Sequence, residues 1–260
     1  MIYDLLASFY DRVNREIDYG AWAQFIEDIF DKEMKERPSL VMDLGCGTGK
    51  MTLALAKKGY DMTGIDYSVN MLGVARDAAA EEGLSEKILW LCQDMRRFEL
   101  YGTMGAIVSC LDTVNHLTKE KELSEVVSLV HNYLDPDGLF IFDVNGKRKF
   151  ETLYANQTYV FEEEGDFCVW ENEYDEKSQL CRFLITVFSE ERDGRYRRYE
   201  DEQCEKEFVI NSAKRQFEFG KHNRFLLFLL ANGQKKSTCT YSCRCRKKRQ
   251  YSRLPTSLRP

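Results

Sequence analysis

Apolar residues follow two alternating patterns along the first 145 residues of the chain. Short, nearly continuous apolar runs suit strands that are buried on both faces of a parallel sheet. Between them lie longer segments whose apolar residues recur every three or four positions, as in amphipathic helices. The runs predict strands at 40–44, 62–65, 88–92, 106–111 and 139–144, and helices at 19–30, 51–58, 68–82 and 118–134. This alternation predicts an α/β protein with a Rossmann-like, doubly wound and mostly parallel sheet.

Capping residues mark the boundaries of the predicted helices. Ser68 and Thr118 stand where helices begin, and their side-chain oxygens can accept hydrogen bonds from first-turn N–H groups. Gly59, Gly83 and Gly138 follow helical segments, where glycine readily adopts the left-handed conformation that ends a helix. We therefore expect these five residues to start or terminate the helices.

The pattern changes between residues 146 and 208. Aromatic and β-branched residues alternate there with charged ones, as at 158–161 and 183–188. Such alternation predicts antiparallel strands with one face exposed to water. We expect one domain over 1–260, with an antiparallel insertion at 147–207. The insertion either covers the nucleotide crevice as a lid or extends the edge of the main sheet.

The composition narrows the class of protein. Of the 260 residues, 43% are hydrophobic and 31% charged, as is typical of a folded domain with a sizeable core. The nine cysteines lack the paired spacing of a disulfide framework or a zinc site. The late apolar run at 225–231 is far shorter than the roughly 20 residues of a membrane span. We expect a cytoplasmic protein with reduced thiols, no metal and no membrane association.

Charge is distributed unevenly along the chain. Residues 211–260 contain 13 Lys or Arg and one acid, Glu218, so this basic tail carries +12 and residues 1–210 carry −18 within the formal total of −6. A selected basic arm and a reading-frame change near codon 211 are the two hypotheses for this switch. The second hypothesis predicts that the sheet lacks its usual last two strands.

A glycine-rich turn at 41–50 is the most informative motif. Gly45, Gly47 and Gly49 lie between a predicted strand and helix, where glycine lets the backbone approach a ligand closely. Asp43 can accept a hydrogen bond from an ammonium group, and the free N–H groups of the helix can bind a carboxylate. The turn thus suits an amino-acid zwitterion. Lys50 stands where a dinucleotide-binding fingerprint requires glycine, which disfavours a nicotinamide cofactor.

Acidic residues follow the next two strands. Asp66 comes 19 residues after Gly47, the usual place of a carboxylate that binds ribose hydroxyls in such folds. Asp94 follows the third strand and can accept a hydrogen bond from an exocyclic amine, while the backbone N–H of Met95 can serve a ring nitrogen. The three strand ends together predict a site for an amino acid, a ribose and an adenine.

These motifs, in this order and at this spacing, resemble the class I methyltransferases that depend on S-adenosylmethionine (SAM). The resemblance covers roughly the first 210 residues. The local sequences Tyr10-Asp11, Gln93-Asp-Met and 110–117 are similar to those of a bacterial subgroup of this family. It implies SAM as methyl donor, with its methionine part at Asp43, Gly45 and Gly47, its ribose at Asp66 and its adenine at Asp94 and Met95. It further implies donor contacts by Tyr10, Cys46, Tyr67, Met71 and Cys110.

Several of these residues also have a purely structural interpretation. Met71 has the spacing of a core residue, and Cys46 and Cys92 are small enough to be buried fillers. Asp94, followed by two arginines, could be a solvated loop residue.

Asp112 and His116 are the candidate catalytic residues. They follow the fourth strand, where class I enzymes often place groups that face the substrate, and an imidazole could remove a proton from an amine or hydroxyl. We expect methyl transfer to a small molecule. The alternatives are a non-catalytic SAM-binding or nucleotide-binding module, and an RNA or protein methyltransferase that uses the basic cluster at 244–249. Nucleic acid is the less favoured partner because residues 1–210 are strongly acidic.

Overall fold

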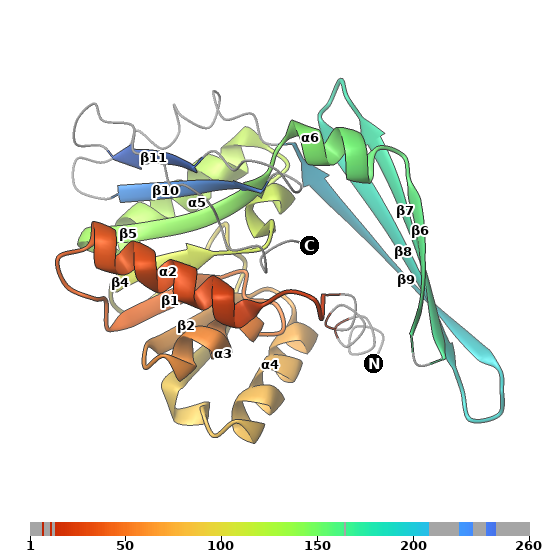
Figure 1. Cartoon of the computed structure of the whole chain (residues 1–260), viewed down its shortest axis with the longest axis horizontal. Helices are drawn as coiled ribbons and strands as arrows, with labels where there is room; N and C mark the ends of the chain where they lie inside the picture. Colours follow the sequence, from red (N-terminus) through yellow and green to blue (C-terminus); the bar gives the residue numbers. More distant parts are fainter. Residues whose placement is uncertain are drawn as a thin grey trace.

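The computed structural model describes Ala7, Asp11, residues 14–163 and 165–207, and the strands at 224–230 and 238–242. These residues form a seven-stranded sheet flanked by helices, and a separate four-stranded antiparallel sheet beside it (Figure 1). The elements of the first part are α2 (Tyr19–Glu33), β1 (Leu40–Leu44), α3 (Lys50–Lys57), β2 (Asp61–Asp66), α4 (Val69–Glu81), η1 (Ser85–Lys87), β3 (Ile88–Cys92), β4 (Met104–Ser109), η2 (Thr113–His116), α5 (Glu120–Tyr133) and β5 (Leu134–Asn145).

The main sheet has the order β11-β10-β5-β4-β1-β2-β3, in which β10 is Arg224–Leu230 and β11 is Thr238–Ser242. Strands β1 to β5 pair in parallel, running outward from β1 to β3 and then returning to β4 on the other side of β1. The doubly wound sheet that the sequence predicts is therefore confirmed. Because parallel strands end at the same edge, the segments that follow β1, β2 and β4 come together where the winding reverses.

Burial on both faces explains the continuous apolar runs. Val41 and Leu139 pack with residues of α2 and α3 on one face of the sheet. Their neighbours Met42 and Phe140 pack with residues of α5 on the other face. Successive strand side chains point to opposite faces, so a strand covered on both sides has no place for polar alternation.

Most predicted helix boundaries agree with the structure. The Ser68 side chain accepts a hydrogen bond from the backbone of Met71 and caps α4, and Gly59 and Gly83 have positive φ after α3 and α4. The prediction that Thr118 caps the next helix is wrong. Lys119 is the N-cap residue of α5, and its backbone N–H donates to Glu122 at 3.2 Å.

Two further boundaries also differ from the prediction. Gly138 does not end a helix, because α5 stops at Tyr133 and β5 begins at the next residue. Strand β4 stops at Ser109 instead of continuing to residue 111. Leu111 and Asp112 have φ values of 59° and 58°, and an extended strand cannot contain two consecutive left-handed residues.

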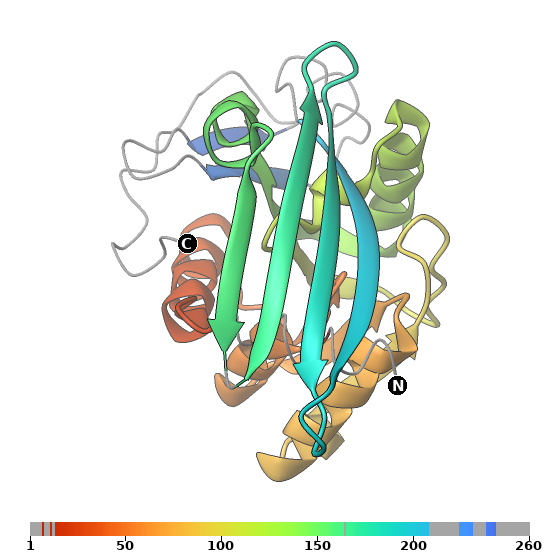
Figure 2. The ribbon, with the colours of Figure 1, turned by 90° about the vertical axis from the view of Figure 1, so that its right-hand side faces the viewer.

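Residues 147–207 form two short helical turns and then the antiparallel sheet. Its elements are α6 (Lys147–Lys149), η3 (Phe150–Tyr154), β6 (Thr158–Glu163), β7 (Asp166–Asp175), β8 (Leu180–Glu190) and β9 (Tyr196–Lys206), with the strands in the order β6-β7-β8-β9. Figures 1 and 2 show this sheet across the side of the main sheet toward which β5 runs. The predicted antiparallel insertion is confirmed, and because it forms its own sheet, the edge-extension alternative is wrong.

The two faces of the antiparallel sheet differ in chemistry. Trp170, Phe183 and Val187 alternate along β7 and β8 and belong to two small apolar clusters. Arg182 faces the other way and forms ion pairs with Glu173 and Glu202. The period-two pattern of the sequence thus separates a packed inner face from a charged outer face.

The basic tail contributes to the main sheet. Strand β10 (Arg224–Leu230) pairs in parallel with β5, and β11 (Thr238–Ser242) pairs antiparallel with β10. The expectation that the sheet lacks two strands is therefore wrong. The apolar run at 225–230 is long enough to continue the hydrogen-bond ladder along the open edge of β5. The reading-frame change near codon 211 stays a hypothesis about the gene.

Substitution of Gly64, with Gly73 as a comparison, tests the packing beneath the glycine-rich turn. A Cβ atom on Gly64 would lie 2.5 Å from two ring atoms of Trp90, whereas one on Gly73 in α4 would meet nothing within 4 Å. We predict that Gly64→Ala lowers the free energy of unfolding by about 1–3 kcal/mol through overpacking. Gly73→Ala should raise it by about 0.5–1 kcal/mol because alanine favours helix. Urea unfolding of both variants checks this, and equal effects would contradict the proposed packing.

Candidate active site

The glycine-rich turn lies at the carboxyl end of β1. Gly45, Gly47 and Gly49 all have positive φ, of 77°, 53° and 77°. A Cβ on Gly45 would lie 2.1 Å from the Thr113 side chain, so glycine there lets η2 approach the turn. A Cβ on Gly47 would meet nothing within 4 Å, and its side of the turn is open. The turn is thus closed by protein at Gly45 and accessible to a ligand at Gly47.

Asp43 is a buried acid beneath this turn. Its side chain accepts a hydrogen bond from the Thr52 hydroxyl at 2.6 Å, and no ion pair within the described residues involves it. Burial, together with the nearby Asp66 carboxylate, raises the pKa of Asp43 to about 7. A buried carboxyl that lacks a cation fits the ammonium group of an amino acid.

Asp66 connects the glycine-rich turn to the end of β2. Its carboxylate accepts hydrogen bonds from the backbone N–H groups of Gly47 and Ser68, each at 2.9 Å. Burial raises the pKa of Asp66, against the effect of these donors. The structure therefore brings Asp43, Gly45, Gly47 and Asp66 together, as the predicted site requires.

Two residues at this site escaped the sequence-based prediction. Asp11 accepts a hydrogen bond from the Thr48 hydroxyl at 2.5 Å and forms an ion pair with Lys50 at 3.2 Å, so it docks on the glycine-rich turn. Burial and then the carboxylates of Asp11, Asp43 and Asp112 raise the pKa of Tyr19, which places its phenol near all three. From sequence alone, an aromatic residue at the start of a helix, such as Tyr19, is expected to pack in the core. Its acidic surroundings become visible only in the folded protein.

Residues predicted to bind adenine have protein partners. Asp94 accepts hydrogen bonds from the guanidinium group of Arg96, the shortest at 2.7 Å, and this contact holds its pKa below the usual range. Met95 is partly buried against the apolar cluster on the α5 side of the sheet. Met71 is half-buried in the first turn of α4. Their contacts with adenine stay predictions.

The remaining predicted donor contacts differ in exposure. Cys46 and Cys110 are buried, whereas the side chain of Tyr67 is 81% exposed. Cys92 is exposed, so its interpretation as a buried filler is wrong, because the third strand lies at the edge of the sheet. Tyr10 lies outside the described residues.

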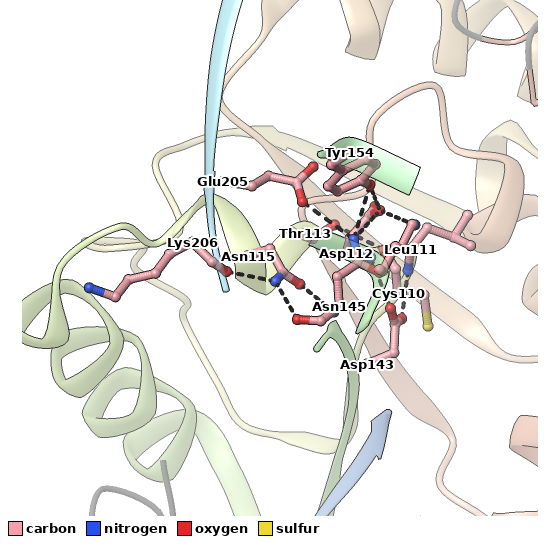
Figure 3. Close-up of polar contacts among 11 residues, drawn as sticks. Cys110, Leu111, Asp112, Thr113, Asn115, Asp143, Asn145, Tyr154, Glu205 and Lys206 are labelled. Atoms are coloured by element: carbon pink, nitrogen blue, oxygen red, sulfur yellow. Dashed lines mark hydrogen bonds and ion pairs between the residues drawn. The ribbon is translucent and has the colours of Figure 1, made fainter. Parts of the chain in front are cut away.

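The loop after β4 contains both candidate catalytic residues. The backbone N–H groups of Leu111 and Asp112 donate to the two carboxylate oxygens of Asp143, at 2.6 and 2.9 Å (Figure 3). Burial, with the Asp112 carboxylate next, raises the pKa of Asp143 to about 7. Positive φ in a leucine is strained, and such strain is often found at functional sites. His116, at the end of η2, is exposed.

A buried polar network surrounds the side chain of Asp112 (Figure 3). Its Oδ2 accepts from Asn145 at 2.8 Å, from Lys149 at 3.3 Å and from the hydroxyl of Tyr154 at 3.5 Å. Asn145 also donates to Glu205 of β9 at 3.3 Å. Burial opposes ionisation of Asp112, but Lys149 and Asn145 outweigh it and hold its pKa below the ordinary value.

Asn115 connects the same loop to both sheets. Its side-chain amide donates to the backbone carbonyls of Asn145, at 3.1 Å, and Lys206, at 2.8 Å, and its Oδ1 accepts from the backbone of Asn145 at 2.8 Å. The end of β5, the η2 segment and the end of β9 are therefore joined through one buried side chain (Figure 3). Asn115 and Asn145 were not predicted, because isolated asparagines carry no sequence signal for such a contact.

Comparison with known proteins identifies the family of this fold and site. A family model described as a methyltransferase domain matches residues 41–138. YqeM of Bacillus subtilis (strain 168), which is classified as a methyltransferase, is 32% identical over 173 residues, 66% of this chain and 67% of that protein. The chain belongs to the class I SAM-dependent methyltransferases. It transfers methyl groups from SAM, and the expected enzyme class and cofactor are confirmed.

Two further similarities bear on this methyltransferase. The crystal structure of a SAM-dependent methyltransferase from Clostridium acetobutylicum ATCC 824 is 26% identical and covers 85% of this chain and 88% of that one, with a TM-score of 0.74. A dTDP-3-amino-3,4,6-trideoxy-alpha-D-glucopyranose N,N-dimethyltransferase of Streptomyces venezuelae is 32% identical over 142 residues, 55% of each protein. The first extends the likeness across most of the fold, and the second is an enzyme whose acceptor is a small molecule.

The methyltransferase should bind SAM in a pH-dependent manner through Asp43. Only the ionised carboxylate attracts an ammonium group, and its pKa is about 7. We predict that affinity for SAM, measured by calorimetry, falls by up to about tenfold for each pH unit below 7. Asp43→Asn should weaken binding and remove most of this dependence, while the exposed Asp61→Asn should change neither. Constant wild-type affinity from about pH 5.5 to 8 would contradict the role of Asp43.

Proposed function

We propose that the acceptor is a small-molecule amine, which binds between the η2 loop and the inner face of the antiparallel sheet. The main support for this proposal is the attachment of β9 to η2, through Asn115 to Lys206, and to the end of β5, through Asn145 to Glu205. In this proposal the antiparallel sheet, held by hydrogen bonds across the carboxyl ends of the strands, shields a small acceptor from water. The amino-sugar dimethyltransferase relative supports the same acceptor class.

The charge of Asp112 supports an amine in particular. When bound, SAM supplies a methyl group on a positively charged sulfur, so alignment of the acceptor matters more than a strong base. A carboxylate whose pKa is held low is a weak base but a stable negative charge. In this proposal Asp112 binds and orients the amine, and the exposed His116 of the same loop takes the proton that the amine loses.

The donor side of the site is proposed to follow the strand ends. Asp43 would hold the ammonium group of SAM, the open side of Gly47 its methionine part, and Asp66 its ribose. Asp66 keeps this capacity because each of its oxygens accepts one backbone hydrogen bond and a carboxylate oxygen can accept two.

The setting of the enzyme is proposed to be the cytoplasm. No helix of the described residues has the length and apolar character to cross a membrane. Cys46, Cys92, Cys110, Cys168, Cys181 and Cys204 are free thiols. Thiols of this kind persist in a reducing compartment.

Labelled SAM tests the acceptor class. After incubation of the enzyme with SAM carrying a labelled methyl group and a cell extract, we expect label in the small-molecule fraction, on amines. Asp112→Asn should lower this transfer roughly 10- to 100-fold, as loss of a charged contact implies, and should leave SAM affinity within about twofold. Asp31→Asn, at an exposed ion pair with Arg37, is the matched control and should retain activity. Label in RNA or protein would instead support the alternative that uses the basic tail.

A further inference from the structure

Lys149 is an unusual residue for its position in the chain. It belongs to the run Lys147-Arg148-Lys149 of α6, whose first two residues are exposed, yet Lys149 itself is only 8% exposed. Its ammonium group lies 3.3 Å from the Asp112 carboxylate and 5.2 Å from the centre of the Tyr154 ring. A lysine is rarely buried unless it is paired, so this placement indicates a specific task.

Three carboxyl groups compete for this one cation. Asp112 reaches Lys149 from the loop after β4, Asp143 lies on β5, and Glu205 lies on β9, while His116 of η2 also acts on Asp112. Burial raises the pKa of Asp143 to about 7 and that of Glu205 well above its ordinary value, so burial opposes ionisation of both. Asp112 is the group that contacts the ammonium directly, and it alone of the three has a lowered pKa.

The conformation of the loop after β4 holds Asp112 in place for its ion pair with Lys149. The backbone of Asp112 is left-handed, and the hydrogen bond from its N–H to Asp143 stabilises this conformation. The backbone therefore fixes the direction in which the Asp112 side chain leaves the loop. The Asp112 carboxylate accepts hydrogen bonds from Lys149, Asn145 and Tyr154. Two of these three come from α6 and η3, which immediately precede the antiparallel sheet.

We propose that Lys149 is a positioning residue that keeps Asp112 ionised and aimed at the acceptor, and thereby couples the insertion to the chemistry of the β4 loop. This inference rests on the proposed function of Asp112. In this proposal Lys149 acts through Asp112 and does not contact the acceptor itself. Without Lys149, the half-buried Asp112 carboxylate would lie near two further acids and would bind a proton.

The pH profile of methyl transfer separates this role from a structural one. Lys149→Met should lower the rate at neutral pH by at least about tenfold and move the acidic limb of the profile upward by about 1–3 pH units, because the opposite charge is lost. Lys149→Arg keeps the charge and should restore the wild-type limb. Lys147→Met, with the same change in charge at an exposed position, should match the wild type. An unmoved limb in Lys149→Met would overturn the proposal.

A double variant shows whether Lys149 acts through Asp112. If it does, Lys149→Met should cost little further activity in the Asp112→Asn background, whereas independent roles would give additive losses and overturn the proposal. SAM affinity, measured by calorimetry, should stay near the wild-type value in all variants and confirms that they are folded.

Unfolding in urea supplies a test that needs no acceptor. In the wild type, the lowered pKa of Asp112 contributes stability that is present at neutral pH and lost as pH falls through the folded-state pKa. An unpaired buried carboxylate costs most when ionised, so the stability deficit of Lys149→Met should be larger at about pH 8 than at about pH 5. A deficit independent of pH would overturn the inference. Absence of any methyl transfer by the wild type, with this pH-dependent deficit present, would instead reject the proposed function alone.

Discussion

Burial of the parallel sheet on both faces governs where polar chemistry can occur in this protein. With α2 and α3 on one face and α5 on the other, the central strands β1, β4 and β5 bury side chains on both faces. Chemistry is therefore confined to the edge where the parallel strands end. The glycine-rich turn, Asp66 and the loop after β4 meet at that edge because the winding of the sheet reverses between β1 and β4.

The same edge concentrates negative charge away from water. Asp43 and Asp143 are buried acids. Their pKa values rise to about 7 because desolvation penalises the charged form. Asp112 differs because Lys149 provides an opposite charge at 3.3 Å. Lys149, together with the hydrogen bond from Asn145, therefore favours ionisation of Asp112. A donor with an ammonium group and an acceptor with an amine would each add positive charge to an edge that has too little of it.

Local sequence pattern was sufficient for much of the fold. The strands at 40–44 and 88–92 match the structure residue for residue, and Ser68 caps α4 as its hydroxyl predicts. Such features depend on neighbours in the chain, namely side-chain period and capping chemistry. Predictions failed where tertiary contacts outweighed local preference. The β4 strand ends early because Asp143 stabilises a left-handed turn, and 224–230 becomes a strand because the edge of β5 is available.

For the site, local sequence motifs were enough to predict the donor class. Three strand ends with Gly47, Asp66 and Asp94 in a fixed order specify where amino acid, ribose and adenine are expected, because parallel strands must end together. The surroundings of Asp112, in contrast, depend on contacts between segments far apart in the chain. Asn115, Asn145, Lys149 and Glu205 lie up to 91 residues from their partners, and nothing in their local sequence separates Lys149 from its exposed neighbour Lys147. The physical reason is that burial, which sets the charge and the hydrogen bonds of these side chains, is a property of the packed protein and not of the residue.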